Sequence, residues 1–205
     1  QYKILLLGDD CVDEYQYGYV DRISPEAPVP VFKYSYTETL PGMASNVEAN
    51  LKSLGCKVFS FKGTPSNKKR LIDIRSRQHI VRIDEDIKSD PFVFDHISYP
   101  LEAVDAIVIS DYNKGFISYD LVETIQRQYH GPVFVDTKKP LLKRFEGCYV
   151  KINALEYSLA KSFPKDLIVT LGAHGAKYNE QEFSAPKIEV VDVCGAGDTF
   201  LSALA

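Results

Sequence analysis

A carboxylate stands beside glycines at a predicted helix start near the end of the chain. Residues 191–193 alternate as a strand does, a glycine turn follows, and residues 199–205 have the apolar pattern of a helix. Free N–H groups at a helix start attract phosphate, and glycines let an anion approach the backbone. Asp198 would oppose a plain phosphate cradle, whereas phosphoryl transfer needs a carboxylate that deprotonates the attacking hydroxyl. The alternative is that Asp198 is only a helix N-cap.

Other polar residues follow predicted strands at their carboxyl ends. From residue 106 onward strands and helices alternate regularly, which predicts an α/β fold with a mainly parallel sheet. Its strands and the first strand of the chain end in Asp9, Asp111, Asp136, Asn153 and Thr170. Polar residues at the same end of parallel strands converge on one crevice, where ligands bind. Asp9 and the nearby Asp13 are therefore candidates for binding sugar hydroxyls, although an Asp-rich turn explains Asp9 about as well.

Asn153 and Glu156 are spaced one helical turn apart across a predicted helix start. An amide and a carboxylate facing one point suit a hydrated Mg²⁺ between phosphates, because magnesium keeps several waters and takes few protein oxygens. The alternative is a capping box, with Asn153 as N-cap and Glu156 at the third helical position. The two interpretations carry equal weight on the sequence alone.

A second glycine-led helix start lies at Gly42 to Asn46. Val47 and Leu51 follow at helical spacing, and Gly55 has the character of a C-cap. A second ligand group is expected to dock at this start. The alternative for Asn46 is a solvent-facing position on the helix.

Three alternating segments interrupt the α/β pattern. They cover residues 31–37, 70–75 and 79–84, and a proline-rich extended connector over residues 22–30 precedes the first. Half-exposed strands of this kind predict a small antiparallel sheet set apart from the main one. Such a sheet could act as a lid.

The composition is that of an ordinary soluble globular protein. The chain has 205 residues, 45% hydrophobic and 25% charged, with a formal net charge of -4. Mild acidity argues against nucleic acid or an anionic membrane as the main partner, and no apolar run approaches the roughly 20 residues that span a bilayer. The cysteines and histidines are scattered, which favours reduced thiols in the cytoplasm and no metal cluster. Neither a P-loop nor a dinucleotide-binding glycine motif occurs.

Both ends of the chain have the look of cut ends. It starts at Gln1, its only methionine is Met43, and it stops within an apolar helix pattern. We expect it to be part of a longer natural chain.

Together the motifs resemble those of the ribokinase-like (PfkB) carbohydrate kinases, over nearly the whole chain. They follow the family's order, and the most specific is Gly195-Ala196-Gly197-Asp198; the others are Gly8-Asp9 with Asp13, Pro41-Gly42-x-Ala44-x-Asn46, Asn153-x-x-Glu156 and Val169-Thr170-Leu171-Gly172-x-x-Gly175. Residues 22–30 and Ser110-Asp111-Tyr112-x-Lys114-Gly115 look most like the branch that phosphorylates heptose 7-phosphate at C1. The resemblance implies a three-layer ribokinase-like fold with a β-lid from about residues 18–40 and 68–86.

The resemblance also implies an ATP-dependent sugar kinase that uses Mg²⁺ and pairs through its lid in a dimer. Asp198 would be the base, and Gly195, Ala196 and Gly197 the anion hole. Asn153 and Glu156 would serve the Mg²⁺ and phosphate end of ATP, with Glu156 reaching the metal through water. Thr170, Gly172 and Gly175 would hold the nucleotide, and Asp13, Gly42, Asn46 and, less strongly, Lys114 the sugar. Arg22 and Arg82 are weaker candidates for a phosphate already on the sugar.

The chain departs from the family at three places. The usual Gly-Gly before the first helix is Gly42-Met43, which puts the substrate in question. A strand and helix normally found between Phe61 and Lys69 are largely missing, as are helices that close over the adenine after Ala205. A catalytically weak or inactive nucleotide- or sugar-binding relative is therefore the rival hypothesis, and an α/β domain for some other small molecule is the third.

Overall fold

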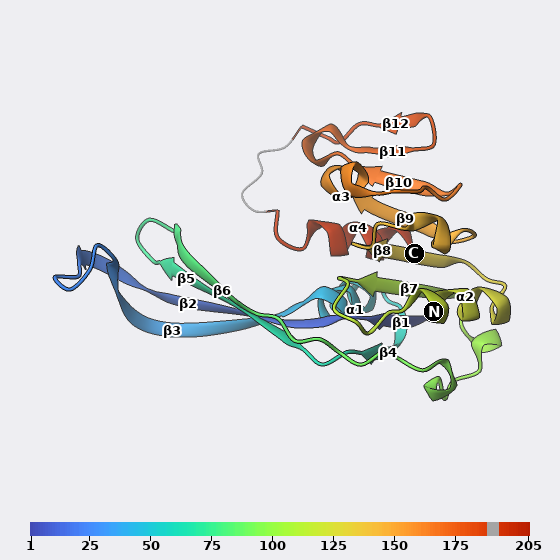
Figure 1. Cartoon of the computed structure of the whole chain (residues 1–205), viewed down its shortest axis with the longest axis horizontal. Coiled ribbons are helices and arrows are strands. Elements are labelled where there is room, and N and C mark those ends of the chain that lie inside the picture. Colours follow the sequence, from blue (N-terminus) through green and yellow to red (C-terminus); the bar gives the residue numbers. More distant parts are fainter. Residues whose placement is uncertain (188–192) are drawn as a thin grey trace.

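An eight-stranded sheet forms the centre of the computed structural model, which describes residues 1–187 and 193–205 (Figure 1). The strands lie in the order β12-β11-β10-β9-β8-β7-β1-β4, parallel from β4 to β10 and antiparallel at β11 and β12. Their bounds are β1 (Lys3–Gly8), β4 (Lys57–Lys62), β7 (Ala106–Asp111), β8 (Val133–Thr137), β9 (Tyr149–Asn153), β10 (Leu167–Thr170), β11 (Ala176–Tyr178) and β12 (Gln181–Phe183). The expected mainly parallel α/β sheet is confirmed.

Helices cover both faces of this sheet, which makes three layers. They are α1 (Met43–Ser53), α2 (Tyr119–Gln128), α3 (Ala154–Leu159) and α4 (Ala196–Leu204), with short 3-10 turns η1 (Phe94–His96), η2 (Leu101–Ala103), η3 (Leu142–Phe145) and η4 (Gly172–His174). None of the helices among the described residues is long and apolar enough to cross a membrane.

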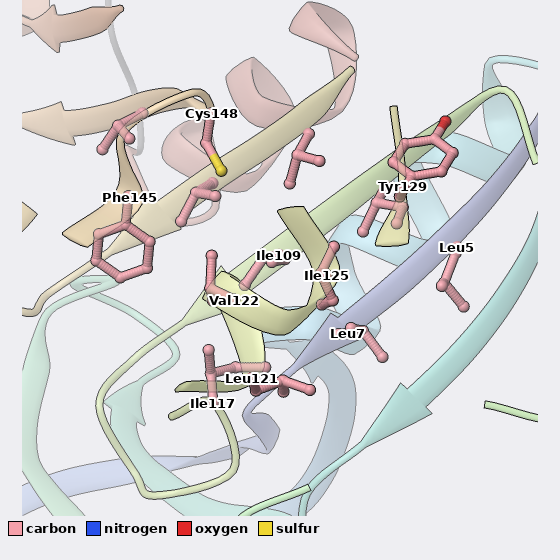
Figure 2. Packing of buried hydrophobic residues seen from close by; sticks show 14 of the residues in the cluster. Leu5, Leu7, Ile109, Ile117, Leu121, Val122, Ile125, Tyr129, Phe145 and Cys148 are labelled. Carbon is pink, nitrogen blue, oxygen red and sulfur yellow. The ribbon is translucent and has the colours of Figure 1, made fainter. Parts of the chain in front are cut away.

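The side-chain alternation of β1 divides the core in two. Leu5 and Leu7 point to the face covered by α2, where Val122 and Ile125 complete a large apolar cluster (Figure 2). Ile4 and Leu6 point to the opposite face and pack with Val47 of α1 and Leu201 of α4. A strand buried on both faces reads as a continuous apolar run, which is what residues 4–7 are.

A second sheet of four strands projects from one side of the body (Figure 1). Its order is β3-β2-β5-β6, with bounds β2 (Asp10–Ile23), β3 (Pro30–Gly42), β5 (Ser66–Asp73) and β6 (His79–Glu85). The sheet is antiparallel except between β2 and β5, which run parallel. We call these four strands the lid.

The sequence predicted three of the four lid strands. It did not predict β2, which is continuous from Asp10 and contains Asp13. The physical reason is that β2 has no clear two-residue period, since most of its side chains are partly exposed on both faces. β11 and β12 form an antiparallel hairpin at the edge of the main sheet. Residues 191 and 192 of the strand expected over residues 191–193 lie outside the described residues.

Candidate active site

Asp198 lies in the first turn of α4, and its side chain is not a cap. The helix begins at Ala196, three residues before the predicted start, and its N-cap is Gly195, with φ of 73° in the left-handed region that glycine tolerates. Asp198 is only 5% exposed and points away from the helix end into the protein. The N-cap alternative for Asp198 is therefore wrong.

Two donors hold the Asp198 carboxylate. Asn46 Nδ2 donates to Oδ2 at 2.8 Å and the Tyr112 hydroxyl donates to Oδ1 at 2.9 Å. Burial raises the pKa of Asp198, while these two hydrogen bonds and the charge of Lys151 lower it. Burial and the Asp198 charge also raise the pKa of Tyr112, so its hydroxyl stays protonated and remains a donor. The result is an oriented carboxylate with both oxygens engaged.

The carboxylate forms one end of a cavity of about 370 Å³ between the lid and the body. Its lining includes Asp198, three of the predicted sugar residues and several lid side chains: Asp13, Tyr15, Leu40, Pro41, Gly42, Met43, Asn46, Lys68, Arg70, Tyr112, Cys194, Gly195 and Asp198. The alternative of a solvent-facing Asn46 is wrong, because its amide bonds the Asp198 carboxylate. Arg70 forms an ion pair with Asp13, which fixes that carboxylate at the wall.

Glycine is required at residue 42 because the Asp13 side chain lies close to its backbone. A Cβ at this residue would stand 2.4 Å from Asp13 Oδ2, so any larger residue would displace the Asp13 carboxylate. The structure therefore brings together Asp13, the helix start with Gly42 and Asn46, and Asp198, which come from three separate parts of the sequence.

Backbone amides and a buried ion pair surround the start of α4. The amides of Gly197 and Asp198 belong to the first turn, where helix geometry provides no intrahelical acceptor. Lys151 Nζ lies 2.7 Å from Asp136 Oδ2, and a Cβ at Gly197 would come within 2.9 Å of the same ammonium. Burial raises the pKa of Asp136 to about 6 against the lowering effect of Lys151. A positive charge directly behind an anion hole would stabilise charge on a transferring phosphoryl group.

A second cavity of about 430 Å³ opens beside the start of α4. It is lined by Thr170, Gly172, Gly175, Ala176, Phe183, Ser184, Ala185, Pro186, Ala196, Gly197 and Phe200. The predicted nucleotide residues Thr170, Gly172 and Gly175 thus share a cavity with Ala196 and Gly197, which the sequence predicted as part of an anion hole. Two cavities therefore meet at the N-terminus of α4, and transfer between two substrates requires such a geometry.

Asn153 and Glu156 form a complete capping box. Asn153 Oδ1 accepts from the Glu156 amide at 2.9 Å, and Glu156 Oε2 accepts from the Asn153 amide at 2.8 Å. The charge of Glu156 also raises the pKa of Asp136. Within residues 1–187 and 193–205, no group of three or more His, Cys, Asp or Glu could hold a metal ion.

Two residues proposed for the sugar have other positions. Asp9 is 1% exposed and accepts the backbone amides of Lys114 and Phe116 at 3.0 and 3.3 Å, so it shapes the turn after β7 and cannot reach a ligand. The Lys114 ammonium pairs with Asp86 at 2.5 Å, and Lys114 is not part of the cavity lining. The prediction for Asp9 was wrong, and the prediction for Lys114 lacks support as a direct contact within this cavity.

Arg22 and Arg82 lie on lid strands and are exposed. Neither belongs to the cavity lining, and Arg82 donates to both oxygens of Asp84 at 2.8 Å.

Residues 150–205 match the family model described as "pfkB family carbohydrate kinase". That range contains Asn153, Glu156, Thr170 and the glycines and carboxylate of α4. The chain belongs to the pfkB carbohydrate kinase family. The expectation from the sequence motifs is confirmed.

Curated relatives of this pfkB-family chain include proteins that carry the same description. "Bifunctional protein HldE" of a Nitratiruptor species is 33% identical over 261 residues, covering 98% of this chain and 56% of the relative. A protein of the same description from Helicobacter pylori is 30% identical and covers 98% of this chain and 57% of the relative. The chain spans little more than half the length of these relatives.

Solved structures of sugar kinases share the fold. A ribokinase from Thermotoga maritima superposes with a TM-score of 0.67 and 15% identity, covering 99% of this chain and 84% of that one. Phosphofructokinase-2 from Escherichia coli in complex with substrates and products gives a TM-score of 0.67 and 14% identity, covering 100% and 85%. The expected ribokinase-like fold is confirmed.

Met43 has a backbone conformation that is uncommon for a residue other than glycine. It has φ of 49°, in the left-handed region where non-glycine residues are strained, and its side chain lines the cavity while only 3% exposed. The departure from Gly-Gly that the sequence indicated therefore coincides with a strained backbone at the cavity wall.

Proposed function

We propose that this chain is the ATP-dependent sugar kinase part of the protein and that Asp198 is its base. In this reaction Asp198 takes the proton of an acceptor hydroxyl while the hydroxyl oxygen forms a bond to the γ-phosphorus of ATP. The bond from that phosphorus to the bridging oxygen breaks, and ADP leaves. The observation that supports the proposal is a buried carboxylate between two cavities, beside the free amides of a helix start.

The chain's own residues supply binding and charge. Gly197 and Asp198 offer backbone amides to the transferring phosphoryl, and Lys151 adds a positive charge behind them. Thr170, Gly172 and Gly175 line the cavity proposed for the nucleotide. When bound, Mg²⁺ neutralises charge on the ATP phosphates, and Glu156 is the residue proposed to hold it through water.

The acceptor is proposed to be a sugar phosphate, with heptose 7-phosphate phosphorylated at C1 as the specific candidate. The resemblance of residues 22–30 and 110–115 to the heptose-phosphate branch supports this choice, as does the similarity to the HldE proteins.

The lid displays Tyr34, Tyr36, Val81 and Ile83 as exposed side chains, which supports pairing with the lid of a second copy. A cytoplasmic location suits the free cysteines of the described chain and the use of ATP.

The test is ADP release from Mg·ATP with a panel of sugars and sugar phosphates. Asp198→Asn keeps the size of the side chain and is expected to lower turnover by about 10²–10⁴-fold, the usual contribution of a positioned base. Asp166→Asn is the matched control, because its carboxylate bonds Tyr178 away from both cavities. Equal rates for wild type and Asp198→Asn would remove Asp198 from the mechanism.

The second candidate function is a nucleotide- or sugar-binding relative with little turnover. Two observations favour it: the strained Met43 in the sugar cavity, and a capping box that engages Asn153 and Glu156 with each other. Calorimetry would separate the two functions, since tight binding of ATP and sugar phosphate by the full-length protein without turnover supports the binding protein.

A further inference from the structure

A buried ion pair lies beside the turn that carries Tyr112. Lys139 Nζ lies 2.7 and 2.8 Å from the two carboxylate oxygens of Asp111, and the two side chains are 9% and 0% exposed. The Thr137 hydroxyl donates to the same carboxylate at 2.6 Å and accepts the Lys139 amide at 3.1 Å. Asp111 ends β7, Thr137 ends β8, and the two residues are paired in the sheet. We call Asp111, Thr137 and Lys139 the buried network.

The buried network has no direct contact with a ligand space. Among the residues that the structure describes as lining the cavities beside Asp198 and beside Gly197, none belongs to it. Stability alone is a weak reason for such a pair, because taking two charges out of water offsets most of their attraction. The role of the network is therefore sought in the backbone that it holds.

The network fixes the backbone on both sides of Tyr112 and beside Lys138. Asp111 Oδ1 accepts the amide of Asn113 at 2.9 Å, and Asn113 has φ of 59°, a left-handed conformation that asparagine tolerates in turns. The carbonyl of Asp111 accepts the Lys138 amide at 3.0 Å, which ties the turn after β8 to the same strand end. Lys138 Nζ lies 4.3 Å from the centroid of the Tyr112 ring, so the two turns meet in a cation–π contact next to the network.

A second buried carboxylate holds the far end of the Tyr112 turn. Asp9 accepts the amides of Lys114 and Phe116 at 3.0 and 3.3 Å. Burial raises the pKa of Asp9, the Lys114 amide lowers it, and the charges of Asp111 and Lys139 then act on it in opposite directions. The turn over residues 111–116 is therefore anchored by carboxylates at both ends, and one ammonium acts on both carboxylates.

We propose that the buried network is a positioning device that holds the Tyr112 hydroxyl on the Asp198 carboxylate. This inference rests on the proposed function, in which Asp198 is the base. The hydroxyl lies 2.9 Å from Asp198 Oδ1, and a hydrogen bond weakens steeply when its angle is lost. Without Lys139, the Asp111 charge stays buried and unpaired, so the turn that it anchors has to rearrange. The hydroxyl at the end of the ring then leaves its alignment.

Other groups also act on Asp198 and stay in place when the network is altered. They are Asn46 of α1, which donates to the carboxylate, and the charges of Lys151 on β9 and Asp13 on β2. A change in the ionisation of Asp198 that follows from the network is therefore expected to come through Tyr112.

The experiment follows the ionisation of Asp198 in the full chain without substrates. The carboxyl carbon of labelled aspartate is titrated by NMR, and the Asp198 signal is assigned with Asp198→Asn. A hydrogen bond to a charged group corresponds to about one to two pKa units, so a weakened bond in Lys139→Met should raise the midpoint by roughly 0.5 to 1 pH unit. Thr137→Val keeps every charge and should raise the midpoint by less.

Arg144→Met is the matched control, and its midpoint should equal that of the wild type. Arg144 and Lys139 both place a cation near the Tyr119 ring, at 4.7 and 5.8 Å from its centroid. Arg144 pairs with Asp120 and Glu123 instead of Asp111, so its loss leaves the buried network intact.

Tyr112→Phe combined with Lys139→Met tests the route. If the network acts through the Tyr112 hydroxyl, Lys139→Met adds no shift once that hydroxyl is gone. A shift of the same size in both backgrounds would show that the Lys139 charge acts on Asp198 directly, and it would overturn the proposal. An unchanged midpoint in both Lys139→Met and Thr137→Val would overturn it as well. If circular dichroism shows that Lys139→Met does not fold, Thr137→Val in the same two backgrounds decides the question.

The midpoint is read without turnover, so these outcomes differ from failure of the proposed kinase function. That function is measured by ADP release from the wild type and Asp198→Asn. With Asp198 as the base, the acidic limb of kcat/KM should move by the same amount as the midpoint, because kcat/KM reports the ionisation of the free enzyme.

Discussion

Removing the Tyr112 hydroxyl should change the pH dependence of the reaction. Tyr112 donates to Asp198 at 2.9 Å, and this bond is one of the contacts that lower the pKa of a carboxylate whose burial raises it. A hydrogen bond to a charged group contributes about 1.5–3 kcal/mol. One pKa unit corresponds to about 1.36 kcal/mol. Tyr112→Phe should therefore move the acidic limb of kcat/KM upward by roughly one to two pH units, because the base needs a higher pH to ionise.

The phenylalanine keeps the ring that Lys138 and Lys68 face, so the substitution removes the hydroxyl alone. The assay is ADP release with Mg·ATP and a sugar phosphate over a range of pH, with kcat/KM fitted at each point. Tyr178→Phe is the control, because its hydroxyl also bonds a carboxylate, that of Asp166 at 2.6 Å, away from both cavities. An acidic limb that stays in place or moves to lower pH in Tyr112→Phe would refute the argument.

Three further variants test other parts of the structure. Lys139→Met leaves the buried Asp111 carboxylate without its ammonium, so urea unfolding should show a loss of about 3–5 kcal/mol, and a loss below about 1 kcal/mol would contradict the burial of the pair. Gly195→Ala forces a left-handed residue at φ of 73° and places Cβ 2.8 Å from Asn46 Nδ2; stability should fall by about 1–2 kcal/mol and kcat should fall with it, whereas an unchanged kcat would refute the role of Asn46. Asp73 has a pKa lowered to about 2 by backbone bonds from Ser76 and Val20, so its stabilising effect is complete above its ordinary pKa of 3.8 and is lost as pH falls through about 2. The Asp73→Asn variant should therefore be less stable than wild type at neutral pH, and the difference in urea midpoints should narrow at acidic pH; a constant difference would contradict it.

The sequence alone was sufficient for the parts of the site that depend on strand ends and helix starts. Asp198, Gly195 and Asn46 were found because glycine before an apolar helix pattern marks a helix start, and both such starts meet at the lid side of one sheet. The βα alternation gave the parallel sheet for the same kind of reason, since buried parallel strands read as apolar runs.

Contacts between distant segments could not be predicted in this way. Tyr112 bonds a carboxylate 86 residues later, and no local pattern in the sequence assigns its hydroxyl to that partner. Lys151 interrupts an otherwise apolar strand, which was a usable signal, but its partner Asp136 and its place behind Gly197 follow only from the packing of β8, β9 and α4. Asp9 was misassigned because a carboxylate at a strand end serves equally well to bind a ligand or to hold a turn.

The way the lid joins the body has a mechanical consequence. Strand β2 leaves the carboxyl end of β1, β3 runs directly into α1, and β5 follows β4 after a short turn, so continuous strands connect the two parts (Figure 1). Asp13, Gly42 and Lys68 lie on these strands at the cavity. Any tilt of the lid must therefore move these three residues relative to Asp198. The orientation of the lid and the shape of the cavity are coupled, so a displacement of the far end of the lid would change the cavity.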